Sequence, residues 1–377
     1  MDETRPLRRG WTTGTCATAA AKAAYSALVT GDFPDPVEVT LPGDQTPAFA
    51  LATHGLAEGS AFAGVVKDAG DDPDVTHGAL IVATVRAGAP GSGVTFKAGA
   101  GVGTVTRPGL PVPPGEPAIN PVPRDMMRGA VAEVCAATGA SGDVEIEVSI
   151  EDGERLAERT LNGRLGIVGG LSILGTTGIV VPYSCAAWIA SIHQGIDVAR
   201  AEGLDHVAGA TGNASEQAVR RLHGLADQAL LDMGDFVGGT LKYLRKHPVP
   251  KVTVCGGIAK MTKLAQGFLD LHSKRGRVDF EALAEVAVAQ GGSASLKAEI
   301  IGANTTPDAF ARAEAEGIRL GDAIAADAWN TAAGVIAGTD MLLEIVLFDR
   351  DGNLVGRAPF APVRDVSHDA SRPRKRR

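Results

Sequence analysis

The chain has 377 residues, 45% of them hydrophobic and 21% charged, which suits a soluble globular protein with room for two cores. Its net charge of −8 argues against nucleic acid as the main partner. The four cysteines and eight histidines show no metal-ligand spacing. No apolar run reaches the roughly 20 residues that cross a bilayer, and "MDETRPLRRG" lacks the apolar core of a signal peptide. We therefore expect a reduced, cytoplasmic protein without a nucleic-acid, membrane or protein-bound metal partner, and a homo-oligomer is possible.

Residues 1–155 are predicted to form an α+β domain. An alanine-rich helix over 15–29 ends before Gly31, and a second helix over 124–139 follows a proline-rich segment. β-type runs lie at 37–41, 48–53, 62–67, 79–85 and 143–150. The last of these alternates apolar and polar residues with the period of a half-buried strand.

Residues 156–350 are predicted to form an α/β domain with a mainly parallel sheet. Strand-like runs alternate with helical segments, which is typical of βαβ units; the runs are "LGIVGG", "TGIVVP", "HVAGATG", "QALLDMG" and "KVTVCGG". Helical stretches near 279–289, 307–317 and 321–337 precede an apolar strand over 341–348. Residues 351–377, which end in "SRPRKRR", are expected to be a partly disordered tail.

The opening run "WTTGTCAT" places Thr12, Thr13, Gly14 and Thr15 at the start of a helix, just after Arg9. A helix start has unpaired backbone N–H groups and a positive dipole end, so hydroxyls and a glycine there can form a cradle for a carboxylate or phosphate. One threonine is enough for a cap. Ligand binding and helix capping with packing therefore both stay open.

A second candidate for an acidic ligand is the glycine loop "KAGAGVGTVTRPG", which is flanked by Lys97 and Arg107. It lacks the third glycine and the strand–loop–helix context of a dinucleotide fingerprint. A tight hairpin is the alternative.

The run "KDAGDDPDVTHG" clusters Asp68, Asp71, Asp72 and Asp74. The spacing does not match an EF-hand. A solvated acidic loop and a patch facing a cationic ligand are both possible interpretations.

Loops at the ends of predicted parallel strands favour a nucleoside-like cofactor, because open α/β sheets bind ligands at the carboxyl ends of their strands. An acidic side chain there is a usual partner of ribose hydroxyls. Ordinary αβ turns are the alternative, since glycine, asparagine and aspartate favour turns in any case. The candidate cofactor-binding residues are Gly175, Thr176, Thr177, Thr211, Gly212, Asn213, Asp235, Gly256 and Gly257.

The sequence resembles the cobalt-precorrin-5B (C1)-methyltransferases along nearly its whole length, from about residue 5 to residue 350. The resemblance rests on long, unusual runs, among them "LRRGWTTGTCATAAAKAA", "GAGVGTVTRPGLPVPPGEPAINPVPRDMM", "GRLGIVGGLSILGTTGIV" and "GDFVGGTLKYLRKHPVPKVTVCGGIAKMTKLAQG". It implies methyl transfer from S-adenosylmethionine to ring carbon C1 of a cobalt-containing tetrapyrrole, giving cobalt-precorrin-6A. It also implies a two-part fold distinct from the common corrin-methylase fold.

This resemblance implies that residues 1–155 bind substrate and residues 156–350 bind cofactor. The substrate's carboxylates would meet Arg9, Thr12, Thr13, Gly14, Thr15, Lys97 and Arg107. Cobalt would arrive inside the substrate. Methyl transfer from a sulfonium is an in-line displacement that depends on positioning, so we expect no catalytic cysteine and assign Cys16 to packing, while the catalytic residues stay unassigned. A nicotinamide-dependent oxidoreductase of tetrapyrrole metabolism and a non-catalytic tetrapyrrole carrier are the alternatives.

Overall fold

A computed structural model describes residues 6–363 of the chain. The chain divides into two compact units, an N-terminal unit up to Cys185 and a C-terminal unit from Ala186. Both contain helices and mixed sheets. Within residues 6–363, none of the helices has the length and apolar character needed to cross a membrane.

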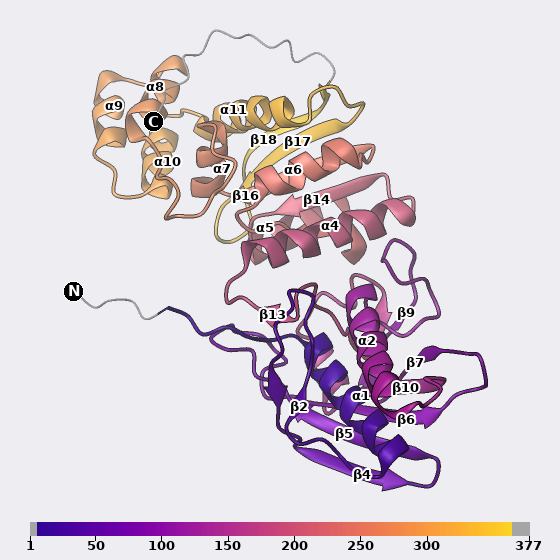
Figure 1. Ribbon diagram of the computed structural model, residues 1–377. Helices are drawn as coiled ribbons and strands as arrows, with labels where there is room; N and C mark the ends of the chain where they lie inside the picture. Colours follow the sequence, from indigo (N-terminus) through magenta and orange to yellow (C-terminus); the bar gives the residue numbers. More distant parts are fainter. Residues whose placement is uncertain (1–5, 364–377) are drawn as a thin grey trace. The chain divides into compact units, whose positions relative to one another are not determined.

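The N-terminal unit is built on a sheet with the strand order β4-β5-β6-β10-β7 (Figure 1). Neighbouring strands are antiparallel except β7, which runs parallel to β10. The bounds are β4 (Thr53–Ala57), β5 (Ser60–Val66), β6 (Leu80–Ala87), β7 (Val94–Ala98) and β10 (Val144–Ile150). In β10 every second residue is buried, which confirms the predicted alternation.

The helices of this unit are α1 (Thr13–Thr30), α2 (Pro121–Thr138) and the short α3 (Gly153–Ala157). α1 packs on β5, β6 and α2 (Figure 1). Its buried alanines allow this close approach, since they add little bulk between helix and sheet. The helix ends at Gly31, whose φ of 86° suits glycine and whose N–H donates to the Ala27 carbonyl.

Pairs of short strands complete the N-terminal unit. These are β1 (Gly10–Trp11) with β13 (Ile179–Val180), β2 (Val37–Glu38) with β3 (Ala48–Phe49), β8 (Gly101–Val102) with β12 (Gly170–Leu171), and β9 (Thr104–Val105) with β11 (Ile167–Val168). The runs "LGIVGG" and "TGIVVP" therefore belong to this unit and not to the parallel sheet as predicted. Because their pairing partners lie at residues 10–11 and 101–105, the unit boundary falls at 185/186 instead of 155/156.

The sheet of the C-terminal unit has the strand order β15-β14-β16-β17-β18. All neighbours are parallel except β18, which is antiparallel to β17. The bounds are β14 (His206–Ala210), β15 (Leu230–Asp232), β16 (Lys251–Gly257), β17 (Leu342–Phe348) and β18 (Leu354–Pro362). β18 corrects the prediction of a tail from residue 351, because it pairs with β17. The basic run "SRPRKRR" lies outside the described residues.

Helices cover both faces of this sheet. Their bounds are α4 (Cys185–Ala201), α5 (Asn213–His223), the 3-10 helix η1 (Asp227–Ala229), α6 (Val237–Lys246), α7 (Ile258–Ala265), α8 (Phe280–Ala289), α9 (Ala294–Ile301), α10 (Thr306–Ala315) and α11 (Leu320–Val335). Alternate strand residues pack on α5, and the intervening ones pack on α4, α6, α7 and α11. The prediction missed α9, whose eight residues are too few for a clear apolar period.

Candidate functional site

The carboxyl ends of β14, β15 and β16 meet at one edge of the C-terminal sheet. The chain leaves β14 through α5 to β15 on one side, and returns through α6 to β16 on the other side of β14. α5, which follows β14, and α7, which follows β16, pack on opposite faces, so the loops that follow these two strands diverge. Such a switch point is where open α/β sheets form a ligand crevice.

The strand register brings together predicted cofactor-binding residues from the loops after β14 and β16. Ala210 pairs with Cys255, and the Thr211 N–H continues this ladder by donating to the Cys255 carbonyl at 3.0 Å. Thr211 therefore lies beside Gly256, where an added Cβ would be 2.4 Å from Thr211 Oγ1. Gly256 is thus needed for packing between the two loops.

Gly212 and Gly257, one residue further along each loop, border open space. At either position an added Cβ would have no heavy atom of the described residues within 4 Å, its chain neighbours aside. Gly257 is exposed and has φ −70° and ψ 154°, which any residue adopts. A ligand can therefore approach the backbone closely at these two glycines.

Lys260 joins the strand-end loops. Its ammonium donates to the Thr211 carbonyl at 2.6 Å and forms an ion pair with Asp235 Oδ1 at 3.0 Å. That carboxylate oxygen is buried and has no well-aligned hydrogen bond within the described residues, so the ion pair with Lys260 holds it. The Asp235 carbonyl accepts a hydrogen bond from the Leu271 N–H at 3.0 Å. Sequence reasoning selected Asp235 but missed Lys260; its position one turn after the glycine pair was the available signal.

Asn213 begins α5 directly after Gly212 and is exposed. The Ser215 hydroxyl donates to the Gly212 carbonyl at 2.8 Å. Because the first N–H groups of a helix lack intrahelical acceptors, the start of α5 adds hydrogen-bond donors and positive dipole to this edge.

The threonines of the opening run lie in the N-terminal unit, and their hydroxyls bond within the protein. Thr12 Oγ1 accepts from the Thr15 N–H at 3.2 Å, which makes Thr12 the N-cap of α1. Thr15 Oγ1 donates to the Gly178 carbonyl at 2.7 Å, and Thr13 Oγ1 accepts from the Leu174 N–H at 3.1 Å. All three threonines are buried, so capping and packing explain these hydroxyls.

Gly14 also has a packing role, because an added Cβ there would lie 2.7 Å from Pro123 Cγ. The loop that accepts the threonine bonds contains Gly175, Thr176 and Thr177, which were predicted at the end of a parallel strand. That derivation is wrong for these three residues, since they lie in the N-terminal unit between β12 and β13. Gly175 has a φ of +131°, and an added Cβ would be 2.6 Å from Thr12.

The predicted substrate cations do not gather at the threonines. Lys97 pairs with Glu147 at 2.9 Å. Glu147 alternates with the buried residues of β10 that face α1, so this pair lies on the other face of the sheet. Arg107 packs against Gly166, where an added Cβ would be 2.4 Å from Arg107 Cδ. Arg9 is exposed, directly before β1.

The acidic run at 68–74 holds the N-terminal unit together. The Arg8 guanidinium binds the Asp68 carboxylate and lowers its pKa to about 2. Asp71 accepts from the Arg8 N–H at 2.6 Å, and Asp72 accepts from the Tyr183 N–H at 2.8 Å. These carboxylates therefore have internal partners, which accounts for the cluster without a cationic ligand.

Asp74 is half-buried and pairs with the buried Lys67. Burial by itself raises the pKa of the Asp74 carboxyl, but the Lys67 ammonium at 2.5 Å and the Thr76 hydroxyl outweigh that effect, so the pKa lies below its usual value. Lys67 is itself 1% exposed. The pair is a structural ion pair between a buried ammonium and a half-buried carboxylate.

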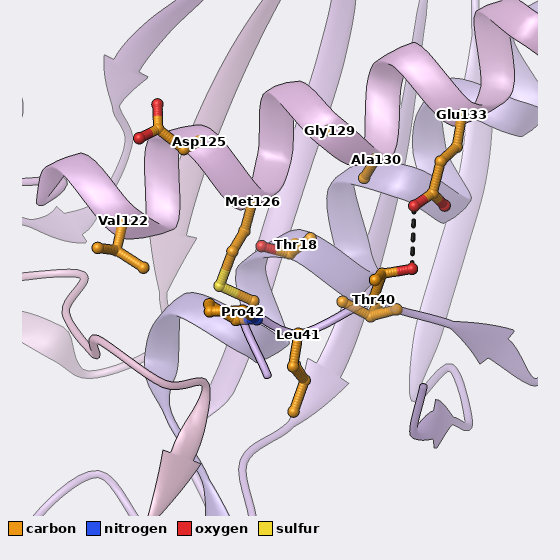
Figure 2. A pocket seen from close by; sticks show the side chains of 11 residues that line it. Thr18, Thr40, Leu41, Pro42, Val122, Asp125, Met126, Gly129, Ala130 and Glu133 are labelled. Atoms are coloured by element: carbon orange, nitrogen blue, oxygen red, sulfur yellow. Dashed lines mark hydrogen bonds between the residues drawn. The ribbon is translucent and has the colours of Figure 1, made fainter. Parts of the chain in front are cut away.

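A cavity of about 410 Å³ lies between α1, α2 and residues 39–42 (Figure 2). Leu41, Val122 and Met126 contribute apolar side chains to its lining, and Asp125 and Glu133 are its acidic residues, with the Asp125 carboxylate pointing away from Leu41 and Met126 (Figure 2). Glu133 accepts from the Thr40 hydroxyl at 3.0 Å and pairs with Lys22 at 2.6 Å. The lining contains two acidic residues and no lysine or arginine, so it does not suit a polycarboxylate ligand.

Among residues 6–363, no group of three or more His, Cys, Asp or Glu side chains could hold a metal ion. Within the described residues, the edge at the carboxyl ends of β14 and β16 is the strongest candidate site.

Comparisons with known proteins identify the family. The CbiD model matches residues 1–182, and the CbiD C-terminal domain model matches residues 270–359. The chain belongs to the CbiD family. The CbiD relative from Halorhodospira halophila, named cobalt-precorrin-5B C(1)-methyltransferase, is 61% identical over 355 residues, which cover 94% of this chain and 95% of that protein. The relative of the same name from Agrobacterium fabrum is 60% identical over 373 residues, covering 99% and 98%.

The strand-edge residues 211–213, 235 and 256–260 of this CbiD chain lie between the two ranges that the family models match, but the Agrobacterium alignment spans 99% of the chain. Among solved structures, the crystal structure of the cobalamin biosynthesis protein CbiD from Archaeoglobus fulgidus is similar with 28% identity. The similarity covers 67% of this chain and 77% of that one, with a TM-score of 0.38, too low to support an argument about the fold.

Proposed function

We propose that this CbiD chain transfers a methyl group from S-adenosylmethionine to C1 of cobalt-precorrin-5B, giving cobalt-precorrin-6A in oxygen-independent cobalamin biosynthesis in the cytoplasm. The observation that carries the proposal is similarity over nearly the whole chain to relatives with that enzyme name, at 61% and 60% identity. The proposal also assigns the N-terminal unit, an α+β domain, to the substrate and the C-terminal unit, an α/β domain, to the methyl donor. Together they would form a fold distinct from the common corrin-methylase fold.

The chemistry of the donor fits the edge at the carboxyl ends of β14 and β16. S-Adenosylmethionine supplies an electrophilic methyl group on a sulfonium. Gly212 and Gly257 leave the backbone open to its approach, and the Asp235 carboxylate can accept hydrogen bonds from ribose hydroxyls. Asn213 and the first N–H groups of α5 can bind its carboxylate.

The residues of this chain position the reactants and form no covalent intermediate. Lys260 orients Asp235 through the 3.0 Å ion pair and ties it to the loop after β14. Burial raises the pKa of the Cys16 thiol to about 12 and also raises that of Cys255, so neither thiol is available as a thiolate nucleophile. Rate acceleration would come from alignment for in-line displacement.

On the substrate side, the hydroxyls of Thr13 and Thr15 bind the loop over residues 174–178. We therefore assign the substrate contact to that loop instead of to the hydroxyls. Thr176 is exposed in that loop, and Arg9 is exposed directly before β1. β1 pairs with β13, so Arg9 and this loop border the same strand pair. We assign Arg9 to the substrate's carboxylates, with Arg107 as a second cation.

Calorimetry with S-adenosylhomocysteine and with NADH, followed by anaerobic turnover of cobalt-precorrin-5B, tests the proposal. We expect saturable binding of S-adenosylhomocysteine, no binding of NADH, and methylated product that requires S-adenosylmethionine. Binding of NADH alone would favour an oxidoreductase. Binding of the tetrapyrrole without S-adenosylhomocysteine would favour a carrier.

A further inference from the structure

Trp188, in the first turn of α4, is exposed over 46% of its surface in a unit whose large apolar side chains are mostly buried. Its only polar group is already used. The indole N–H donates to the Asp232 carbonyl, at the carboxyl end of β15, at 3.0 Å. What Trp188 leaves exposed is therefore apolar aromatic surface.

The loop after β15 fixes the orientation of this ring. An added Cβ at Gly234, which has a φ of +55°, would lie 3.3 Å from Trp188 Cζ2, so the ring packs over that turn. The Phe236 ring lies 6.2 Å away and is tilted by 55°. The Gly234 N–H donates to the Ala210 carbonyl at 3.2 Å, which joins the turn to the end of β14. The indole is thus held rigidly before any ligand binds.

The same turn carries Asp235, which Lys260 holds at 3.0 Å. The turn over residues 232–236 consequently carries the oriented Asp235 carboxylate and also holds the ring of Trp188. A nucleoside offers the complementary pair of groups, ribose hydroxyls and a flat base. Stacking of a base on an aromatic side chain is a general source of affinity for nucleosides.

We propose that Trp188 is the stacking platform for the adenine of the methyl donor, with Asp235 on the ribose of the same molecule. This inference rests on the proposed function. It makes Trp188 a determinant of cofactor affinity and not of the methyl-transfer step.

The test compares wild type, Trp188→Ala and Trp188→Phe by calorimetry with S-adenosylhomocysteine and with adenosine. Leu222→Ala, which removes an exposed apolar side chain from α5, is the matched control. We expect Trp188→Ala to raise both dissociation constants at least tenfold, Trp188→Phe to raise them less, and the control to leave them unchanged. Quenching of tryptophan fluorescence by S-adenosylhomocysteine should occur in wild type and disappear in Trp188→Phe, which gives a readout even if Trp188→Ala does not fold.

Equal affinity for S-adenosylhomocysteine in wild type and Trp188→Ala, or quenching that persists in Trp188→Phe, would overturn the inference and leave the proposed function intact. Weaker binding of the tetrapyrrole with unchanged binding of S-adenosylhomocysteine would also overturn it, by assigning the ring to the substrate. Failure of wild type itself to bind S-adenosylhomocysteine would refute the proposed function instead.

Discussion

The Thr15 hydroxyl is buried and donates to the Gly178 carbonyl at 2.7 Å, so it ties the start of α1 to a loop far along the chain. The opening run shows that more hydroxyls are present than a cap requires. It does not show that a distant carbonyl accepts one of them. The choice between a ligand and packing therefore depended on a long-range contact.

Thr15→Val tests this contact, because valine keeps the shape of threonine and removes the hydrogen bond. We expect the free energy of unfolding to fall by about 0.5–1.5 kcal/mol, since the buried Gly178 carbonyl would lose the Thr15 hydroxyl and keep the Thr12 N–H, which donates to it at 3.1 Å. Thr176→Val, at an exposed position of the same loop, should change it by less than about 0.5 kcal/mol. Urea unfolding measures both. Unchanged stability with a raised KM for the substrate would support the ligand interpretation instead.

His206 is expected to make the protein sensitive to acid. Burial, aided by the nearby His223, lowers the pKa of His206 from 6.5 to about 4. His206 Nε2 contacts the Thr253 hydroxyl at 2.8 Å; that hydroxyl donates to the buried Glu344 carboxylate, which also binds His223 and Arg357. Between pH 6.5 and pH 4 the unfolded chain binds a proton that the folded chain excludes, so stability falls as the pH falls.

His206→Gln should reduce this dependence, because glutamine can keep the bond to Thr253 without titrating. We expect the variant to lose less stability than wild type between pH 6.5 and pH 4, as measured by urea unfolding across that range. His272→Gln, at an exposed position, should retain the wild-type slope. A slope that is the same in His206→Gln and wild type would show that His206 is not excluded from protonation.

At the scale of elements, the junction of β16 and α7 places two glycines in opposite environments. Gly256→Ala puts a Cβ 2.4 Å from Thr211 Oγ1, and we expect it to destabilise the protein by about 1–3 kcal/mol. Gly257→Ala meets open space in an allowed conformation and should leave stability unchanged or raise it by about 0.4–1 kcal/mol. Because a methyl group at residue 257 would obstruct the methyl donor, we expect the dissociation constant of the Gly257→Ala variant for S-adenosylhomocysteine to rise about tenfold. Normal affinity in a stable Gly257→Ala would place the donor elsewhere.

Long elements were predictable because their apolar period repeats several times. β10 alternates over its whole length, and α1 shows both its alanine-rich surface and its terminating glycine. The short strands at residues 167–180 resemble buried parallel strands in composition but pair with residues 10–11 and 101–105. A run of two paired residues has no period to read, so its sheet could not be assigned from the sequence.

At the scale of the whole chain, the prediction from the carboxyl ends of parallel strands selected residues that lie together at one edge of the C-terminal sheet. Thr211, Gly212, Gly256 and Gly257 are brought together because β14 and β16 are neighbours in the sheet. Lys260 was missed, since its contacts with Thr211 and Asp235 depend on the strand order. A sequence shows which residues end strands, whereas the strand order decides which of them meet.

The crystal structure of this protein with S-adenosylhomocysteine tests the central claim most directly. We predict density for the ligand at the carboxyl edge of β14 and β16, beside Gly212 and Gly257, with a ribose hydroxyl within hydrogen-bond distance of Asp235. Density in the cavity between α1 and α2 shown in Figure 2, or at any site away from that edge, would contradict it.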